Sequence, residues 1–326
     1  MKAIVFTKYG SLDVLKLEEV PKPTPTDDQV LVQVHASSVN YANLAHVRGE
    51  PFISRLWSGF LEPKDKIPGG DLAGRVEAVG RNVTQFQPGD EVFGDLADCG
   101  FGAFAEYVAV SERSIALKPA NMTFEEAAAV PQAGIVALQG LRDQGQIQPG
   151  QKVLIAGASG GNGTFAVQVA KSFGAEVTGV CSTRNVDLVR SIGADHVIDY
   201  TKEDFATSGQ YYDLILSTAG YRSIFDYKRA LSPQGTYVSA GGAMAQVYQG
   251  MLLGPLVSVA GSKKLTFLYA RQDQQDLVFL KELIEAGKVK SVIDRRYPLS
   301  EAAEALRYYG EGRSRGKVVI TVKHNS

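Results

Sequence analysis

From Lys152 onward the sequence alternates short apolar runs with amphipathic segments, and this alternation restricts the possible folds more than any other feature. Repeated strand–helix–strand units with right-handed connections build a parallel sheet covered by helices on both faces. Gly174 and Gly193 follow two of the helical segments, where a residue without Cβ can adopt the left-handed conformation of a helix end. The pattern predicts an α/β fold with strands at 153–156, 177–180, 197–198, 214–217, 236–239 and 265–268.

The residues before this region follow a different pattern. Short β-branched runs such as 30–34 and 71–79 are separated by Gly- and Pro-containing turns, which is typical of a compact, mostly antiparallel β domain. Thr123 and Glu126 have the spacing of a capping box, which predicts the start of a helix at this point. We therefore expect a β domain to precede the alternating region.

The length of 326 residues exceeds what one hydrophobic core usually supports, so two domains are expected. Six strands already complete a doubly wound sheet, and a further predicted strand at 317–322 therefore belongs to the β domain. We predict a discontinuous first domain of residues 1–124 and 272–326, and a doubly wound α/β domain of residues 125–271.

A glycine-rich turn, Gly157-Ala158-Ser159-Gly160-Gly161-Asn162-Gly163, lies between the first of these strands and a helix. A dinucleotide pyrophosphate needs close approach of the backbone, unpaired amide donors and a favourable helix dipole, and a glycine turn at the start of a helix supplies all three. The strand before and the helix after are present, which favours dinucleotide binding over a structural turn without a ligand.

The residues after the second strand indicate which dinucleotide is bound. A ribose 2′-hydroxyl usually meets an acidic residue at this strand end, whereas here the chain continues Cys181-Ser182-Thr183-Arg184-Asn185. Hydroxyls and a guanidinium suit a 2′-phosphate, so the sequence favours NADP over NAD. The alternatives are that Arg184 is a solvated surface residue and that Ser182 and Thr183 cap the next helix.

Composition excludes several other classes of protein. With 34 basic and 35 acidic residues, the formal charge of −1 leaves no basic excess for a nucleic-acid backbone. The apolar stretch 244–260 is interrupted by glutamines, glycines and a proline, so we expect a buried or pocket-lining segment and no membrane span. The sequence begins without signal-peptide features, which predicts a cytoplasmic protein.

The sequence also contains few cysteines and histidines that could coordinate a metal ion. Two isolated cysteines and four scattered histidines, with no Cys-x-x-Cys pair, do not provide the three or four ligands of a zinc site. His46 is the most suggestive of the histidines, but a single imidazole is not a metal site. We therefore predict that no metal is bound.

Several segments together resemble the medium-chain dehydrogenase/reductase superfamily, in its zinc-free NADPH:quinone oxidoreductase (zeta-crystallin-like) branch, over nearly the whole chain. They are Ser38-Val39-Asn40-Tyr41, Arg48-Gly49, Pro68 to Gly74, Pro88 to Val92, the turn Ala158 to Gly163, Ile198-Asp199-Tyr200 and Gly316 to Val319. The resemblance implies a chaperonin-10-like (GroES-like) β domain and a Rossmann domain. It also implies that NADPH lies across the cleft between them and delivers hydride to a quinone or an α,β-unsaturated carbonyl.

The resemblance assigns roles to particular residues. It implies that Ser159, Gly160, Gly161 and Asn162 hold the pyrophosphate, that Ser182 holds the 2′-phosphate, with Thr183 and Arg184 beside it, and that Tyr200 lies at the adenosine end. Thr218, Leu268 and Tyr269 lie near strand ends on the nicotinamide side. Ser314 and Arg315 are placed to reach the cofactor phosphates from the other domain, the alternative being a charged surface segment.

For hydride transfer, the alignment of the nicotinamide with the acceptor and a hydrogen-bond donor near the developing oxyanion matter more than acid–base groups. Asn40 and Tyr41 are the candidate donors, and the alternative is that they only shape a loop. Many family members have Asn-Pro-x-Asp where this chain has Asn40-Tyr41-Ala42-Asn43, so Tyr41 changes the expected substrate pocket.

Two further features leave alternatives open. The aromatic segment 50–66 either forms an apolar lip over the substrate or packs on the β domain. The last strand of the parallel sheet is an exposed edge, which predicts a homodimer. Besides a quinone or enone reductase, the sequence allows a metal-free alcohol or 2-alkenal reductase, or a non-catalytic NADPH-binding protein.

Overall fold

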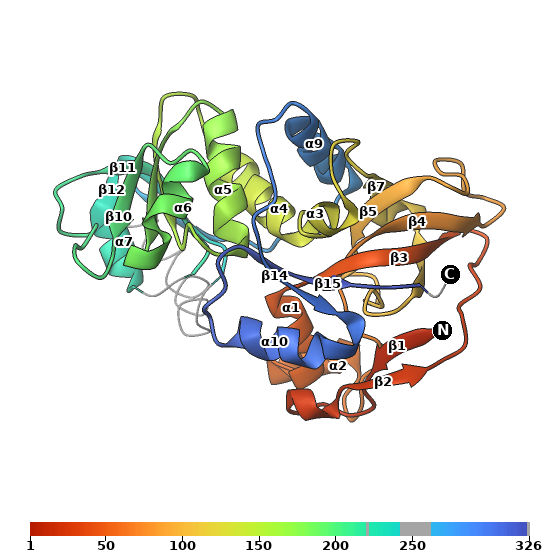
Figure 1. The fold of residues 1–326 in the computed structure, drawn as a ribbon. Helices are drawn as coiled ribbons and strands as arrows, with labels where there is room; N and C mark the ends of the chain where they lie inside the picture. Colours follow the sequence, from red (N-terminus) through yellow and green to blue (C-terminus); the bar gives the residue numbers. More distant parts are fainter. Residues whose placement is uncertain (220–221, 242–261, 325–326) are drawn as a thin grey trace. The chain divides into compact units, whose positions relative to one another are not determined.

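The computed structural model describes residues 1–219, 222–241 and 262–324, except for the side chain of Trp57. The chain divides into two compact units (Figure 1). The first consists of Met1–Gln132, Arg271–Glu285 and Ser291–Ser326, and the second of Ala133–Ala270 and Ala286–Lys290. The predicted apolar stretch 244–260 lies outside the described residues.

The second unit is built on a six-stranded parallel sheet in the order β10-β9-β8-β11-β12-β13. The chain starts in the middle, moves to one edge, returns and moves to the other edge, which is the order of a dinucleotide-binding Rossmann sheet. All six predicted strands are confirmed. Their bounds are β8 Lys152–Ala156, β9 Glu176–Cys181, β10 His196–Asp199, β11 Tyr212–Ser217, β12 Leu231–Ser239 and β13 Lys264–Phe267.

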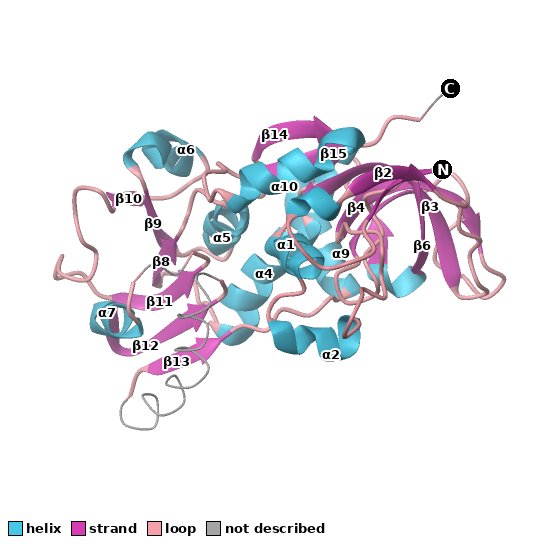
Figure 2. Ribbon diagram, turned by 90° about the horizontal axis from the view of Figure 1, so that it is seen from below, coloured by secondary structure: helices cyan, strands magenta, loops and turns pink. Residues whose placement is uncertain are grey.

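Helices connect these strands and cover the sheet (Figure 2). One helix packs on β8 and β9, the next on β9 and β10, and a third on β12. Gly174 and Gly193 follow the first two helices with positive φ values of 80° and 105°, as the sequence predicts. The helices are α4 Pro131–Leu138 with a π-helical turn at Gln139–Gln144, α5 Gly161–Ser172, α6 Val186–Ser191 and α7 Ile224–Ala230.

The core of the second unit lies between the sheet and its helices. Leu154, Val180 and Ile215 on neighbouring strands are buried together with the rings of Tyr227 and Tyr237, which stack 4.7 Å apart. Central strands of a parallel sheet are buried on both faces, and so their sequences are almost continuously apolar. This is why short apolar runs were enough to locate them.

The first unit contains a seven-stranded, mostly antiparallel sheet in the order β14-β15-β3-β4-β5-β7, with β6 on β3. The long strand β3 pairs with β4 along one edge, and with β6 and then β15 along the other. β15 comes from the C-terminal end, so this segment completes the sheet. A separate two-stranded antiparallel sheet is formed by β1 Lys2–Val5 and β2 Lys16–Glu19. The bounds of the seven-stranded sheet are β3 Gln29–Val39, β4 Asp71–Val79, β5 Glu91–Asp95, β6 Tyr107–Ser111, β7 Ile115–Leu117, β14 Ile293–Pro298 and β15 Lys317–Thr321.

The helices of the first unit are mostly short. α3 begins with the predicted capping box, in which Thr123 Oγ1 accepts from Glu126 N and Glu126 Oε2 accepts from Thr123 N. The sequence did not predict α1, α2, β1, β2 or β14, because these segments lack a clear apolar period. The helices are α1 Tyr41–Arg48, α2 Arg55–Ser58, α3 Phe124–Ala128, α9 Gln274–Glu285 and α10 Ala302–Gly310.

The division of the chain differs slightly from the predicted boundaries. The first unit extends to Gln132 instead of 124, because α3 packs on β3, β4 and β15 of the seven-stranded sheet. The second boundary differs by one residue, and the short segment Ala286–Lys290 is grouped with the second unit.

Candidate functional site

The glycine turn follows β8 and leads into α5, as the sequence predicts. The first N–H groups of a helix have no acceptor within the helix. The first helical bond here joins Thr164 N to Gly160 O at 2.9 Å. The amides of residues 161–163 therefore point out of the start of α5, at the positive end of the helix dipole, where an anion is stabilised.

Two glycines of the turn differ in why they are needed. A Cβ at Gly163 would lie 2.0 Å from the carbonyl oxygen of Gly157, so packing within the chain requires glycine there. Among the described residues, a Cβ at Gly160 would meet only that same oxygen, at an ordinary 3.5 Å. Open space over a glycine beside unpaired amides is what close approach of a phosphate needs. The turn therefore fits a dinucleotide pyrophosphate.

The residues after β9 lie next to this turn. Ser182 is half-buried, Thr183 and Arg184 are exposed, and the side chain of Asn185 is buried. Asn185 Nδ2 donates to Ser159 Oγ in the glycine turn at 2.9 Å and to Ser182 Oγ at 3.3 Å. The structure thus brings together two of the predicted anion-binding segments.

The structure adds a carboxylate that the cofactor prediction did not consider. The sequence shows no carboxylate at the end of β9, but Asp199 at the end of the neighbouring strand β10 pairs in register with Cys181. Thr183 Oγ1 donates to Asp199 Oδ2 at 2.6 Å, and this bond, with those from Thr201, lowers the pKa of Asp199 to about 2. Lys202 Nζ lies 3.4 Å from Asp199 Oδ2 and compensates its charge.

The other predicted cofactor residues of this unit follow the carboxyl ends of its strands. Tyr200 follows β10 and is exposed, and Thr218 follows β11, where its hydroxyl donates to Ala156 O at 3.0 Å. Leu268 and Tyr269 follow β13, the first buried and the second exposed. In a parallel sheet these ends share one edge, which is where such folds bind their ligands.

Ser314 and Arg315 belong to the first unit, in the connection between α10 and β15. Ser314 is half-buried and Arg315 is exposed, and the Arg315 N–H donates to Asp294 Oδ2 at 3.0 Å. Their role at the cofactor phosphates stays a prediction.

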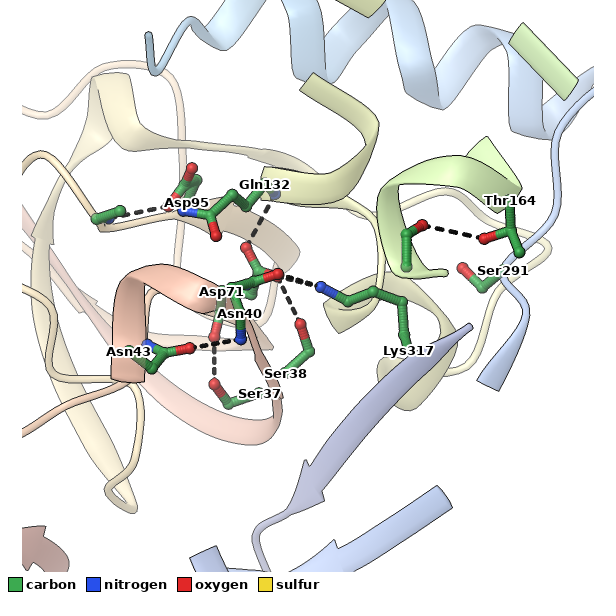
Figure 3. A network of polar contacts seen from close by, with 12 residues as sticks. Ser37, Ser38, Asn40, Asn43, Asp71, Asp95, Gln132, Thr164, Ser291 and Lys317 are labelled. Atoms are coloured by element: carbon green, nitrogen blue, oxygen red, sulfur yellow. Dashed lines mark hydrogen bonds and ion pairs between the residues drawn. The ribbon is translucent and has the colours of Figure 1, made fainter. Parts of the chain in front are cut away.

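A buried polar network surrounds Asn40 in the first unit (Figure 3). Its centre is Asp71, whose Oδ2 accepts from Ser38 Oγ at 2.5 Å and from Asn40 Nδ2 at 2.7 Å, with Lys317 Nζ at 3.3 Å. Asp71 Oδ1 accepts from the Gln132 N–H at 2.9 Å. Lys317 also donates to Asn40 Oδ1. The side chains of Asp71 and Lys317 are 0% and 2% exposed, so their charges are compensated inside the network and not by water.

A second buried carboxylate lies beside this network. Asp95 on β5 pairs in register with Asp71 on β4, and its Oδ1 accepts from the Ala97 N–H at 2.9 Å. Burial, reinforced by the negative charge of Asp71, raises the pKa of Asp95 to about 7. Burial also lowers the pKa of Lys317, against the opposing effect of Asp71.

The two predicted oxyanion donors differ in exposure. Asn40 is the residue before α1 and Tyr41 is the first residue of that helix. Asn40 is 5% exposed, and one of its two Nδ2 protons is bound to Asp71. Tyr41 is 49% exposed. The network thus fixes the Asn40 amide, whereas the Tyr41 side chain reaches solvent. The catalytic role of both residues stays a prediction.

The aromatic segment after α1 has its apolar side chains largely outside the core. Phe52, Leu56, Phe60 and Leu61 are between 54% and 86% exposed, and the rings of Phe52 and Phe60 meet edge to face at 5.8 Å. Tyr9 Oη holds the segment through the Gly59 carbonyl at 2.8 Å. Packing on the β domain therefore does not bury these side chains.

Two observations concern metals and membranes. Among the described residues, no group of three or more His, Cys, Asp or Glu side chains is placed to hold a metal ion. His46 is buried between the rings of Phe6 and Phe101, and its Nε2 lies 2.9 Å from Asp65 O. Within the described part of the chain, no helix has both the length and the apolar character needed to cross a membrane.

The sequence reasoning gave no role to Asp71, Lys317, Asp199 or Asn185. A signal was present for two of them, because Asp71 and Lys317 each begin a strand and are followed directly by buried apolar residues, Leu72-Ala73 and Val318-Val319. Opposite charges at such positions indicate a buried pair. Asp199 and Asn185 had no comparable signal, since both contacts depend on how β8, β9 and β10 lie side by side.

A Rossmann sheet with an open glycine turn, together with a seven-stranded mostly antiparallel β unit, defines the class of two-domain dinucleotide-dependent oxidoreductases. Residues 26–120 match the family model of the alcohol dehydrogenase GroES-like domain, and residues 192–320 match that of the zinc-binding dehydrogenases. The chain belongs to the medium-chain dehydrogenase/reductase superfamily, in its zinc-free quinone oxidoreductase branch.

The relatives include reductases of several conjugated acceptors. The chain is 36% identical to the 2-methylene-furan-3-one reductase of Solanum lycopersicum, over 98% of this chain and 79% of that one. It is 33% identical to the chloroplastic NADPH-dependent alkenal/one oxidoreductase of Arabidopsis thaliana, with the same coverage. The structure of the quinone oxidoreductase from Coxiella burnetii aligns over 99% of both chains, with a TM-score of 0.88 and 30% identity.

Proposed function

We propose that this protein transfers hydride from NADPH to a quinone or an α,β-unsaturated carbonyl, without a metal ion. The observation that carries the proposal is the space that the described residues leave over Gly160, beside the amides of residues 161–163, which precede the first hydrogen bond of α5. The names of the relatives, which act on quinones, alkenals and enones, support the substrate class.

The second unit supplies most of the proposed cofactor contacts. Residues 159–162 bind the pyrophosphate through backbone amides and the Ser159 hydroxyl. Ser182 and Arg184 bind the 2′-phosphate, with Thr183 beside them, and Lys202 offsets the nearby charge of Asp199. The remaining contacts come from Tyr200 at the adenosine end, from Ser314 and Arg315 at the phosphates, and from Thr218, Leu268 and Tyr269 at the nicotinamide half.

The first unit supplies the donors for the acceptor. The nicotinamide ring of NADPH provides the hydride, and negative charge then develops on an oxygen of the acceptor. The second N–H of Asn40 Nδ2 and the phenol of Tyr41 donate to that oxygen. Because Asn40 Oδ1 accepts from Lys317 and Nδ2 donates to Asp71, the amide cannot turn over. Its second N–H, which has no acceptor among the described residues, therefore keeps a fixed direction.

We further propose that the exposed apolar segment 52–61 contacts the apolar part of the acceptor. A Phe60→Ser variant should raise the KM for apolar quinones and leave the KM for a small, polar enone nearly unchanged. Leu17→Ser is the matched control, because Leu17 is an exposed leucine on β2 with no assigned role. Equal KM values for wild type and the Phe60 variant would contradict the lip hypothesis.

The decisive experiment is a screen that follows the absorbance of NADPH and NADH with quinones, enones and saturated aldehydes, with and without a chelator. The proposal expects NADPH-dependent turnover of quinones or enones that the chelator does not change. Turnover of saturated carbonyls alone would indicate an alcohol reductase. Tight NADPH binding without turnover of any acceptor would indicate a non-catalytic binding protein.

We propose two properties of the whole protein, a homodimer and a cytoplasmic location. The dimer is suggested by β13, which is the last strand of its sheet among the described residues. Light scattering should give twice the chain mass of 35.0 kDa, and a monomer mass would refute the dimer. Fractionation of cells tests the location, since the Arabidopsis thaliana relative is named as chloroplastic.

A further inference from the structure

Asn185 is a buried side chain that connects the ends of two neighbouring strands. It precedes α6 and is 4% exposed. Its Nδ2 donates to Ser159 Oγ, in the turn after β8, and to Ser182 Oγ, directly after β9. Its backbone N–H donates to Ser182 O at 2.9 Å, which keeps the residue close to the second serine.

These bonds determine what the two serines can do. A hydroxyl carries one proton and two lone pairs. Each serine oxygen accepts a proton from Asn185, so its own proton is left to be donated elsewhere. Within the described residues, neither the Ser159 nor the Ser182 hydroxyl donates to another group. Both therefore remain donors for a ligand.

The orientation of the Asn185 amide follows from its burial. Its Oδ1 has no partner in the described part of the chain. The reversed amide would place two N–H groups there without acceptors, whereas the observed one leaves a single carbonyl oxygen unpaired. The observed orientation is therefore preferred, and it is the one that makes both serines donors.

The hydroxyl of the next residue, Thr183, already donates its proton within the chain. Thr183 Oγ1 donates its proton to Asp199 at 2.6 Å, while the hydroxyl of Thr201 donates to the other carboxylate oxygen. Of the two hydroxyls that follow β9, only that of Ser182 is available to an anion. Recognition of a phosphate at the end of β9 therefore depends on the orientation of the Ser182 hydroxyl.

We propose that Asn185 is a positioning residue that aims the Ser159 hydroxyl at the cofactor pyrophosphate and the Ser182 hydroxyl at the 2′-phosphate. This inference rests on the proposed function and deepens it. It makes one buried amide responsible for part of the affinity at two separate phosphates. It also makes the preference for NADPH over NADH depend on a residue that touches neither.

The test uses calorimetry with two probes, ADP for the pyrophosphate and 2′,5′-ADP for the 2′-phosphate. Asn185→Ala should weaken both probes by about tenfold, the scale of a hydrogen bond to a charged group. Ser159→Ala should weaken ADP more than Ser182→Ala does, and Ser182→Ala should weaken 2′,5′-ADP more than Ser159→Ala does. Asn185→Asp, of nearly the same shape, should weaken binding further, because a carboxylate takes both serine protons and repels phosphate.

A double-mutant cycle separates positioning from general damage to the fold. In the Ser159→Ala/Ser182→Ala background, Asn185→Ala should cause no further loss of affinity. The same loss in that background as in wild type, or affinities of Asn185→Ala and Asn185→Asp within twofold of wild type, would overturn the inference. If Asn185→Ala fails to fold, the two serine variants decide: loss of the predicted probe by each supports the inference, and no loss by either overturns it.

Binding by the wild-type protein distinguishes a failure of the proposed function from a failure of the inference about Asn185. Wild-type protein that binds neither NADPH nor either probe would overturn the proposed function, and the inference with it. Wild-type protein that binds all three, with variants that bind equally well, would overturn the inference alone.

Discussion

The glycines of the turn after β8 are needed for two different physical reasons. Gly163 is required by the chain, since any Cβ there would collide with the carbonyl of Gly157, whereas the space over Gly160 is open. A sequence shows both simply as glycine. Only the distances separate a glycine that serves packing from one that serves a ligand.

This difference can be tested with two variants that make the same chemical change. Gly160→Ala should keep the melting temperature of wild type and weaken NADPH binding at least about tenfold, because its methyl group occupies the space of a phosphate. Gly163→Ala should destabilise the protein by about 2 kcal/mol or more, because the backbone must move. Thermal unfolding and calorimetry measure the two effects. Unchanged NADPH affinity in Gly160→Ala would contradict the assigned site.

Tyr41 permits a similar test at the acceptor. Tyr41→Phe removes a donor from the developing oxyanion, and should lower kcat/KM by about a hundredfold with little change in NADPH affinity. Steady-state kinetics with the best acceptor of the screen measure the effect. Tyr211→Phe is the control, because Tyr211 is also exposed and has no assigned role. Equal kinetics for both variants would remove Tyr41 from the mechanism.

At the scale of secondary structure, strand pairing brings Asp71 and Lys317 together. β3 pairs with β4 on one edge and with β15 on the other, so a residue near the start of the chain and one near its end meet across a single strand. Two charges this deeply buried stabilise the sheet only while both are present, because either one alone would be left without water or an opposite charge.

The pair predicts a large effect from a single substitution. Lys317→Met leaves the Asp71 carboxylate buried without an opposite charge, and should cost about 3–5 kcal/mol in the free energy of unfolding. Adding Asp71→Asn should recover part of that loss, since no charge is then buried. Arg81→Met breaks the exposed Arg81–Asp27 pair, and should cost less than about 1 kcal/mol. Urea titrations compare these variants, and additive losses in the double variant would contradict the coupling.

At the scale of the whole molecule, the free energy of unfolding depends on pH through two carboxyl groups whose pKa values are shifted in opposite directions. The pKa of Asp95 is raised to about 7, so the folded state binds a proton that the unfolded state releases near pH 4. Stability from this group is therefore lost as the pH rises from about 4 to about 7. The pKa of Asp199 is lowered to about 2, so its contribution is present above pH 4 and is lost as the pH falls toward 2.

Two asparagine variants should show these opposite signs. The free energy of unfolding of Asp95→Asn, relative to that of wild type, should rise between pH 4.5 and pH 7.5, with a slope of up to about 1.4 kcal/mol per pH unit. Asp199→Asn should be less stable than wild type at neutral pH, and the difference should shrink below pH 4. Thermal unfolding across this range measures both. A flat difference for Asp95→Asn would show that its carboxyl group titrates normally.

The sequence by itself determined the features that are local along the chain. The six strands of the parallel sheet, the capping box of α3 and the glycine turn before α5 each depend on residues a few positions apart, whose spacing reflects the period of a helix or strand. The fold class and the proposed place of the pyrophosphate followed from these.

Only the tertiary structure decided which distant side chains meet. The contact of Asn40 with Asp71 and Lys317, the carboxylate of Asp199 beside Thr183, and the link from Asn185 to Ser159 all cross between strands. Such contacts are set by strand order and register, which the period of a single segment does not specify. The orientation of the polar groups at both candidate sites therefore became visible only when the strands were placed side by side.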